Sequence, residues 1–108
     1  MVKLVTLFNL KDGIGVTEFE RYYREVHVPL ARALPGLRRY TRSLVRPSRH
    51  RPVPPFYRIA ELYFDDIDTL KAALASPQGE AINRDTPFFS RVKDMVQMVC
   101  EEEEVPLR

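Results

Sequence analysis

The chain has 108 residues, of which 44% are hydrophobic and 30% charged, and its formal net charge at pH 7 is +2. This length suits one domain with a single core, so we expect one domain over residues 1–108. The single cysteine excludes an internal disulfide, close metal-ligand pairs are absent, and no apolar run could span a bilayer, which together predict a cytoplasmic protein without membrane attachment.

The first third of the chain predicts a strand followed by a helix. Residues 2–9, "VKLVTLFN", are apolar and β-branched and end at "KDG", which is typical of a strand. Thr17 and Glu20 have the spacing of a capping box, so we predict that a helix begins there and covers about 17–33. A Pro-Gly pair at 35–36 ends it. The apolar side chains at helical spacing are Phe19, Tyr22, Tyr23, Val26 and Leu30.

Three further strands are predicted, at 37–46, 56–64 and 91–102. The second of these, "FYRIAELYF", has the strongest strand pattern. The segment between the first two, "PSRHRPVPP", is a proline-rich basic loop.

Two helical segments are predicted between the last two strands. One of the aspartates at 65–66 caps the first segment. Ser76 followed by Pro77 favours the start of the second, which runs to about Phe89 with a break expected before Pro87. The first segment places on one face Ile67, Leu70 and Leu74.

The element order β-α-β-β-α-β packs most simply as a ferredoxin-like α+β sandwich, with both helical regions on one face of a four-stranded antiparallel sheet. Side chains alternate across a strand, and the strands at 2–9 and 56–64 carry apolar residues on both faces. A solvated sheet face is normally polar. We therefore expect a second copy of the chain to cover the other face and form a homodimer; the alternative is a monomer with an apolar back face.

Three stretches carry a family resemblance across nearly the whole chain. They are F-x-x-Y-Y-x-x-x-H-x-P-L with "LPGLRRY" behind it (Phe19 to Tyr40), "AELYFDDIDTLKAALASPQGEA" (Ala60 to Ala81) and the following "DTPFF". Together they resemble the EthD-like family of the dimeric α/β barrel superfamily. The resemblance implies a barrel made by two chains and a cavity between helices and sheet in each. Related barrels are cofactor-free monooxygenases, polyketide cyclases, lactone isomerases and haem proteins.

His27 stands two residues before a proline, inside the first predicted helix. Pro29 has no N–H to give to the carbonyl of Glu25, so the helix should loosen there and free polar backbone groups near the imidazole. Because histidine titrates near neutral pH, His27 is a candidate catalytic acid or base, with Tyr23 as a hydroxyl donor. The alternative is structural: His27 donates to the freed carbonyl, and the tyrosines are core residues with polar tips.

We predict that a small, largely apolar or aromatic molecule binds between the helices and the sheet. Asp85 is also a candidate acidic companion for His27, and Arg39 or Arg58 is a candidate partner for an acidic group of the ligand. No glycine-rich loop indicates a nucleotide or flavin, so no cofactor is predicted, although haem ligation by His27 stays open. The candidate substrate-binding residues are Thr6, Phe8, Tyr22, Phe64, Asp85 and Phe88.

Taken with the resemblance, these residues favour a cofactor-independent oxidoreductase, such as a monooxygenase, or an isomerase of small-molecule catabolism. Two alternatives stay open: a non-catalytic ligand-binding or stress-response dimer, and a polyketide-cyclase-like enzyme. A filled core around a backbone-bonded His27 would favour the non-catalytic class.

Charge is unevenly distributed along the chain. The segment "LRRYTRSLVRPSRHR" is densely basic, and the tail "CEEEEVPLR" has four consecutive glutamates. A basic run is a candidate nucleic-acid site, but the net charge is small and no nucleic-acid-binding motif is present. We therefore predict no nucleic-acid partner, and expect either a solvated edge strand or pairing between subunits.

Overall fold

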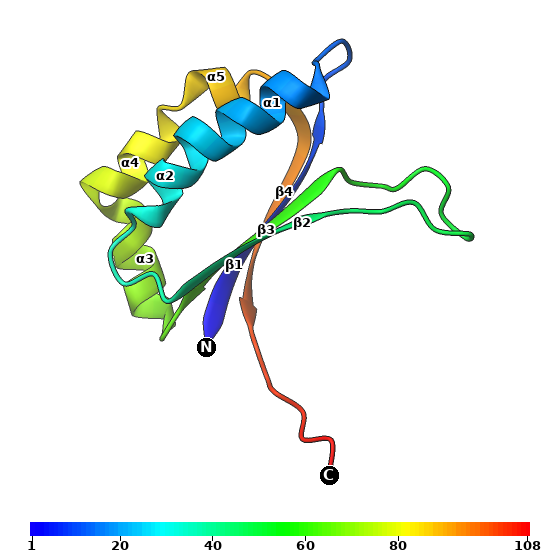
Figure 1. Cartoon of the computed structure of the whole chain (residues 1–108). Coiled ribbons are helices and arrows are strands. Elements are labelled where there is room, and N and C mark those ends of the chain that lie inside the picture. Colours follow the sequence, from blue (N-terminus) through cyan, green and yellow to red (C-terminus); the bar gives the residue numbers. More distant parts are fainter.

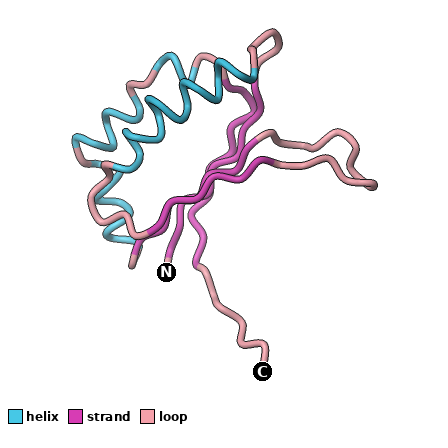
Figure 2. The backbone as a smooth tube through the Cα atoms, viewed as in Figure 1, coloured by secondary structure: helices cyan, strands magenta, loops and turns pink.

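The computed structural model describes residues Met1–Arg108 as one antiparallel sheet with a layer of helices over a single face (Figure 1). The strand order is β2-β3-β1-β4, and every neighbouring pair is antiparallel. Figure 2 shows the strands as one layer with the helices to one side of it. This is the ferredoxin-like α+β fold that the sequence predicted. In chain order the elements are β1 (Val2–Leu10), α1 (Val16–Tyr22), the π-helical segment η1 (Tyr23–His27), α2 (Val28–Arg32), β2 (Arg39–Leu44), β3 (Arg58–Phe64), α3 (Ile67–Ala75), α4 (Pro77–Asn83), α5 (Thr86–Phe89) and β4 (Val92–Glu101).

The helix predicted over 17–33 is one continuous rod with a widened turn in its middle. At the end of η1 the Val28 N–H donates to the carbonyl of Tyr23, five residues back. Pro29 has no N–H for the carbonyl of Glu25, so the regular ladder cannot continue through this turn. The predicted loosening is confirmed, and its form is a π-helical turn, a rare feature that often marks functional sites.

The predicted capping box at the start of this helix is wrong. The helix begins at Val16, and no side chain caps it. The Glu20 carboxylate instead binds the Arg58 guanidinium, with Oε1 2.7 Å from Nη2 and Oε2 3.2 Å from Nε, and accepts a hydrogen bond from the Tyr57 hydroxyl. A two-point, charge-assisted contact is stronger than a neutral cap, so the tertiary partner takes the carboxylate.

The second helical region has three short helices where the sequence predicted two. Asp66 caps α3 by accepting from the Thr69 N–H at 2.8 Å, and Ser76 caps α4 by accepting from the Gly79 N–H at 3.2 Å. The chain breaks again before Pro87, as predicted, and α5 begins there with Asp85 as its cap. The side chain of Asp85 is thereby turned inward at a helix start.

Two hydrophobic clusters lie between the sheet and the helices. The first, at the end of the sheet where β1 begins, contains Val2, Leu4, Leu34, Phe64, Leu70 and Ala73. The second, an aromatic cluster toward the other end of β1, contains Phe8, Phe19, Tyr23, Phe88 and Val92.

The opposite face of the sheet has no helix over it (Figure 1). In the strand register Val5 lies opposite Met98 and Leu7 lies opposite Val96, so this open face carries apolar side chains, as the sequence predicted. Val96 and Met98 are 40% and 46% exposed. No helix is long and apolar enough to cross a membrane.

The basic loop and the acidic tail lie at opposite ends of β1. The Tyr57 N–H, at the loop's end, donates to the carbonyl of Phe8, whereas the Glu102 N–H donates to the carbonyl of Met1. The loop projects away from the helices, and the tail also leaves the sheet on the open side (Figure 1). The two charged segments therefore do not pair within one chain.

Candidate functional site

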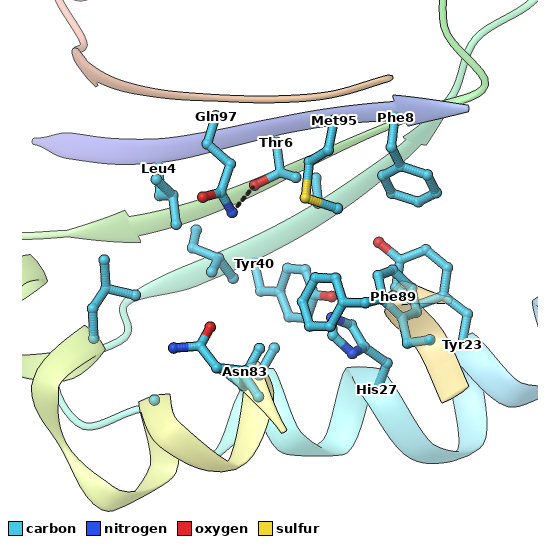
Figure 3. Close-up of a pocket in the computed structure, with 17 residues that line it drawn as sticks. Leu4, Thr6, Phe8, Tyr23, His27, Tyr40, Asn83, Phe89, Met95 and Gln97 are labelled. Carbon is cyan, nitrogen blue, oxygen red and sulfur yellow. Dashed lines mark hydrogen bonds between the residues drawn. The ribbon is translucent and has the colours of Figure 1, made fainter. Parts of the chain in front are cut away.

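A cavity of about 250 Å³ lies between the sheet and the helices, and 12 of its 17 lining residues are hydrophobic (Figure 3). An apolar cavity of ~150 Å³ is enough to hold benzene. This cavity therefore suits a molecule of one substituted ring or two small fused rings.

Small side chains at the centre of the sheet create this space. Thr6 lies opposite Ala60 on β3 and opposite Gln97 on β4, and all three line the cavity. The Gln97 amide donates to the Thr6 hydroxyl at 3.3 Å, which supplies the partner that a hydroxyl on an apolar face requires (Figure 3). Larger side chains on either side of this row, Leu4 and Phe8, close the space.

His27 reaches the cavity from the end of the π-helical turn, and a buried carboxylate lies behind it. His27 Nδ1 is 2.8 Å from Asp85 Oδ2, and the two residues are 8% and 5% exposed. The imidazole stacks on the Phe88 ring, with 3.6 Å between ring centres and 8° between planes. The structural alternative, in which His27 donates to a backbone carbonyl, is therefore wrong.

The Asp85 carboxylate is itself held in place by two further donors. The Tyr22 hydroxyl donates to Oδ1 at 2.5 Å, and the Phe88 N–H donates to the same oxygen at 3.4 Å. Because Oδ1 is occupied in this way, Oδ2 is left to accept from His27. The arrangement fixes both the ring orientation and the tautomer of His27, with the proton on Nδ1.

His27 Nε2 makes no hydrogen bond with the protein, and the imidazole lines the cavity. Burial lowers the pKa of His27 below its ordinary value of 6.5, and Asp85 opposes this shift without cancelling it. His27 is therefore neutral at pH 7, with a free lone pair on Nε2. A neutral imidazole held by a carboxylate on its other nitrogen is suited to act as a general base.

The lowered pKa of His27 predicts a dependence of stability on pH. Protonating His27 costs more in the folded chain than in the unfolded one, so its contribution is complete above about pH 6.5 and is lost as the pH falls toward the folded-state pKa. We expect the free energy of unfolding to decrease in this window for the wild type and less for His27→Gln. Urea unfolding between about pH 5 and 8 measures the free energy of unfolding of both proteins. If it falls equally with pH in the wild type and in His27→Gln, the prediction is contradicted.

Five of the sequence-predicted site residues line the cavity, and three do not. Asp85 binds His27 on the side away from the cavity, and Tyr22 donates a hydrogen bond to Asp85. Phe64 lies outside the cavity, fully buried in the first hydrophobic cluster, because α3 packs over its end of β3. The five that line the cavity are Thr6, Phe8, Tyr23, His27 and Phe88.

The two arginines considered for an acidic ligand group are engaged elsewhere. Arg58 is bound to Glu20, and the Arg39 guanidinium lies over the ring of Tyr63, 5.2 Å from its centre. Neither lines the cavity. The cavity therefore presents no cationic side chain to a ligand.

Sequence reasoning missed several polar residues that line the cavity: Tyr40, Asn83 and Gln97. Tyr40 on β2 and Gln97 on β4 point toward the helices, at positions where a buried sheet face is normally apolar. These polar residues on a sheet face that is normally apolar were the sequence signal for a cavity. It could be interpreted only once the register of the edge strands was known.

Haem does not fit this site. A porphyrin carries four pyrrole rings, whereas the cavity suits two small fused rings at most. No group of three or more His, Cys, Asp or Glu side chains is arranged to hold a metal ion.

The fold and the site define a ferredoxin-like α+β protein with a helix–sheet cavity. The family model of the EthD domain matches residues 11–91. The chain therefore belongs to the EthD family, as its sequence motifs suggested.

One curated relative and one solved structure have the same level of identity to this chain. An uncharacterised 11.0 kDa protein of Rhodococcus erythropolis, from the thcB-thcC intergenic region, is 30% identical over 89 residues, covering 82% of this chain and 84% of the relative. An EthD family protein from Bacillus halodurans C-125 is also 30% identical, covers 95% of this chain and 99% of its own, and has a TM-score of 0.80.

Two more distant structures share the fold. A dimeric ferredoxin-like protein of unknown function from Bacteroides fragilis has a TM-score of 0.67 at 19% identity, covering 94% of this chain and 95% of its own. A mutant of SnoaB, a cofactor-independent oxygenase from Streptomyces nogalater, has a TM-score of 0.68 at 19% identity. The match covers 99% of this chain and 97% of the SnoaB chain.

Proposed function

We propose that this protein binds a small, largely apolar or aromatic molecule in the helix–sheet cavity and that His27 acts on it as a general base. One observation carries the proposal: a buried His27–Asp85 pair whose free nitrogen opens onto a mostly apolar cavity. Burying a titratable pair is costly, and such pairs are concentrated at functional sites. This favours catalysis over a purely binding role.

The chemistry follows from the surroundings of His27. A neutral Nε2 takes a proton from an acidic C–H or O–H of the bound molecule, and the carboxylate of Asp85 stabilises the imidazolium that forms. The apolar walls exclude water and strengthen this interaction. Return of the proton to another atom gives an isomerase, whereas reaction of the carbanion with dioxygen gives an oxygenase. The fold shared with a cofactor-independent oxygenase supports the cofactor-free form of this proposal.

The test is to identify what the protein carries and whether His27 acts on it. Small molecules released by denaturing natively purified protein are identified by mass spectrometry, for the wild type and for His27→Ala. We expect an apolar or aromatic compound in both, consumed only by the wild type. Lys71→Ala, a change at an exposed position on α3, is the matched control. Consumption at the same rate by His27→Ala would refute the catalytic role.

The active form is, in this proposal, a homodimer joined through the open face of the sheet. The support is the apolar patch on β1 and β4 that includes Val5, Val96 and Met98, together with the dimeric description of a protein that shares the fold. A face of this kind is normally covered by a partner.

Introducing a charge on this face should separate the subunits. Met98→Glu places a carboxylate opposite Val5, and burying an unpaired charge costs several kcal/mol. We expect light scattering to give twice the 12.6 kDa chain mass for the wild type and a single chain mass for the variant. Val16→Glu, an exposed position at the start of α1, should remain dimeric. A wild-type monomer at micromolar concentration would contradict the dimer.

A further inference from the structure

Two tyrosine hydroxyls lie at the cavity wall near His27. Tyr23 reaches in from η1 and Tyr40 from β2, and both line the cavity (Figure 3). Tyr23 is only 1% exposed. The two tyrosines are close enough for each to influence the pKa of the other, and neither hydroxyl donates to a carboxylate or carbonyl of the protein. Each hydroxyl has a single O–H, and only one of two neighbouring hydroxyls can donate to the other. At least one O–H is therefore free to donate to a molecule in the cavity.

Both hydroxyls keep their protons at neutral pH. Burial raises the pKa of Tyr23, and burial raises the pKa of Tyr40 still further. They therefore act as hydrogen-bond donors over the whole physiological range. Because these hydroxyls open onto the cavity, the acceptor that fits them is an atom of a molecule bound there.

Positive charge lies directly behind this pair. The Arg42 guanidinium is 4.5 Å from the centre of the Tyr23 ring, and its Nη1 is buried without a hydrogen bond. Arg42 and Arg58 share one counter-ion, Glu20, so the cluster carries one net positive charge. Through this charge both arginines favour negative charge at the tyrosine oxygens.

We propose that the Tyr23 and Tyr40 hydroxyls hold the oxygen of an enolisable carbonyl compound whose α-carbon faces Nε2 of His27. This substrate class rests on the general-base role proposed above. In the step, Nε2 takes the α-proton, the electron pair of the C–H bond forms a carbon–carbon double bond, and the carbonyl π-electrons move to oxygen. The enolate oxygen then accepts the tyrosine hydrogen bonds.

The dimensions of the site agree with this assignment. The ring centres of Tyr23 and His27 are 5.7 Å apart and both side chains line the same cavity, so one small molecule can contact both. The carbonyl oxygen and the α-carbon are both attached to the same carbon. The rest of the substrate meets the apolar walls, which favours a carbonyl fused to or carried by an aromatic ring.

Binding of 2-indanone and indane tests the donor pair, because the two probes differ in a single carbonyl oxygen. We expect the wild type to bind 2-indanone at least tenfold more tightly than indane, Tyr40→Phe to lose part of this preference, and the Tyr23→Phe/Tyr40→Phe double variant to bind the two alike. Tyr63→Phe, which removes a hydroxyl outside the cavity, should keep the wild-type preference. Equal binding of the two probes by the wild type overturns the assignment of the tyrosines.

Exchange of the α-hydrogens of 2-indanone in deuterium oxide, followed by mass spectrometry, tests the proton transfer. We expect Tyr40→Phe to lower the catalysed rate about 100-fold, the scale of losing one oxyanion donor. His27→Gln should abolish catalysis while keeping the preference for the ketone. If His27→Gln exchanges like the wild type, the general-base function fails. If His27→Gln abolishes exchange but Tyr40→Phe exchanges like the wild type, the general-base role of His27 is kept and the assignment of a carbonyl substrate is refuted.

Discussion

Replacing Asp85 with asparagine is expected to lower the rate of base-catalysed exchange by about 1000-fold or more, the scale seen when a histidine loses its orienting carboxylate. The contacts of Asp85 explain why an isosteric change has so large an effect. The Tyr22 hydroxyl and the Phe88 N–H both donate to Oδ1. The single oxygen of the asparagine amide stays with these donors, so its NH₂ group faces His27.

That orientation changes the tautomer of His27. An NH₂ group can only donate, so Nδ1 becomes the acceptor and the ring proton moves to Nε2. Nε2 then points a proton, and not a lone pair, into the cavity. Nitrogen NMR of histidine-labelled protein, in a His50→Gln background that leaves one histidine, should show protonation at Nδ1 in the parent and at Nε2 in Asp85→Asn.

Tyr22→Phe is the matched control for this experiment. It removes one donor to Asp85 but leaves the carboxylate, so the tautomer should be kept and the rate should fall far less. An Asp85→Asn variant that retained exchange within tenfold of the wild type, or that kept its proton on Nδ1, would show that the carboxylate does not set the state of His27.

Replacing Phe64 with alanine is expected to lower the free energy of unfolding by about 3–5 kcal/mol. The Phe64 side chain is 0% exposed and packs in a cluster with Leu34 and Leu70. Removing the ring takes apolar area out of the core and leaves a void that the rigid sheet cannot close. The loss is a large fraction of the roughly 5–15 kcal/mol that stabilises a typical domain. Urea unfolding at fixed protein concentration measures it.

A milder pair of variants separates this structural role from a role in binding. Phe64→Leu should keep the affinity for 2-indanone, since Phe64 lies outside the cavity. Phe88→Leu should weaken that affinity, because Phe88 lines the cavity and stacks on His27. A loss of stability under about 1 kcal/mol for Phe64→Ala would contradict the packing argument, and a selective loss of affinity in Phe64→Leu would return Phe64 to the binding site.

Local sequence was sufficient to predict the framework. Strand alternation, the Ser76 cap and the proline in the first turn of α5 are decided by residues close together in the chain, so the order of elements and the ferredoxin-like fold followed from them. The loosened turn at Pro29 was likewise a local consequence, because a missing N–H acts on the carbonyl four residues back.

The tertiary structure alone decided which side chains meet. The sequence offered Asp85 only as a candidate companion of His27, because the two lie 58 residues apart and no spacing rule fixes their distance. Nothing in the sequence linked Asp85 to Tyr22, which is 63 residues away. Glu20 has the spacing of a cap, but a guanidinium 38 residues away binds it more strongly. Tyr40 faces the cavity because the register of an edge strand places it there. Sequence pattern assigns side chains to a face of an element, whereas the partners across the core depend on how two layers are stacked.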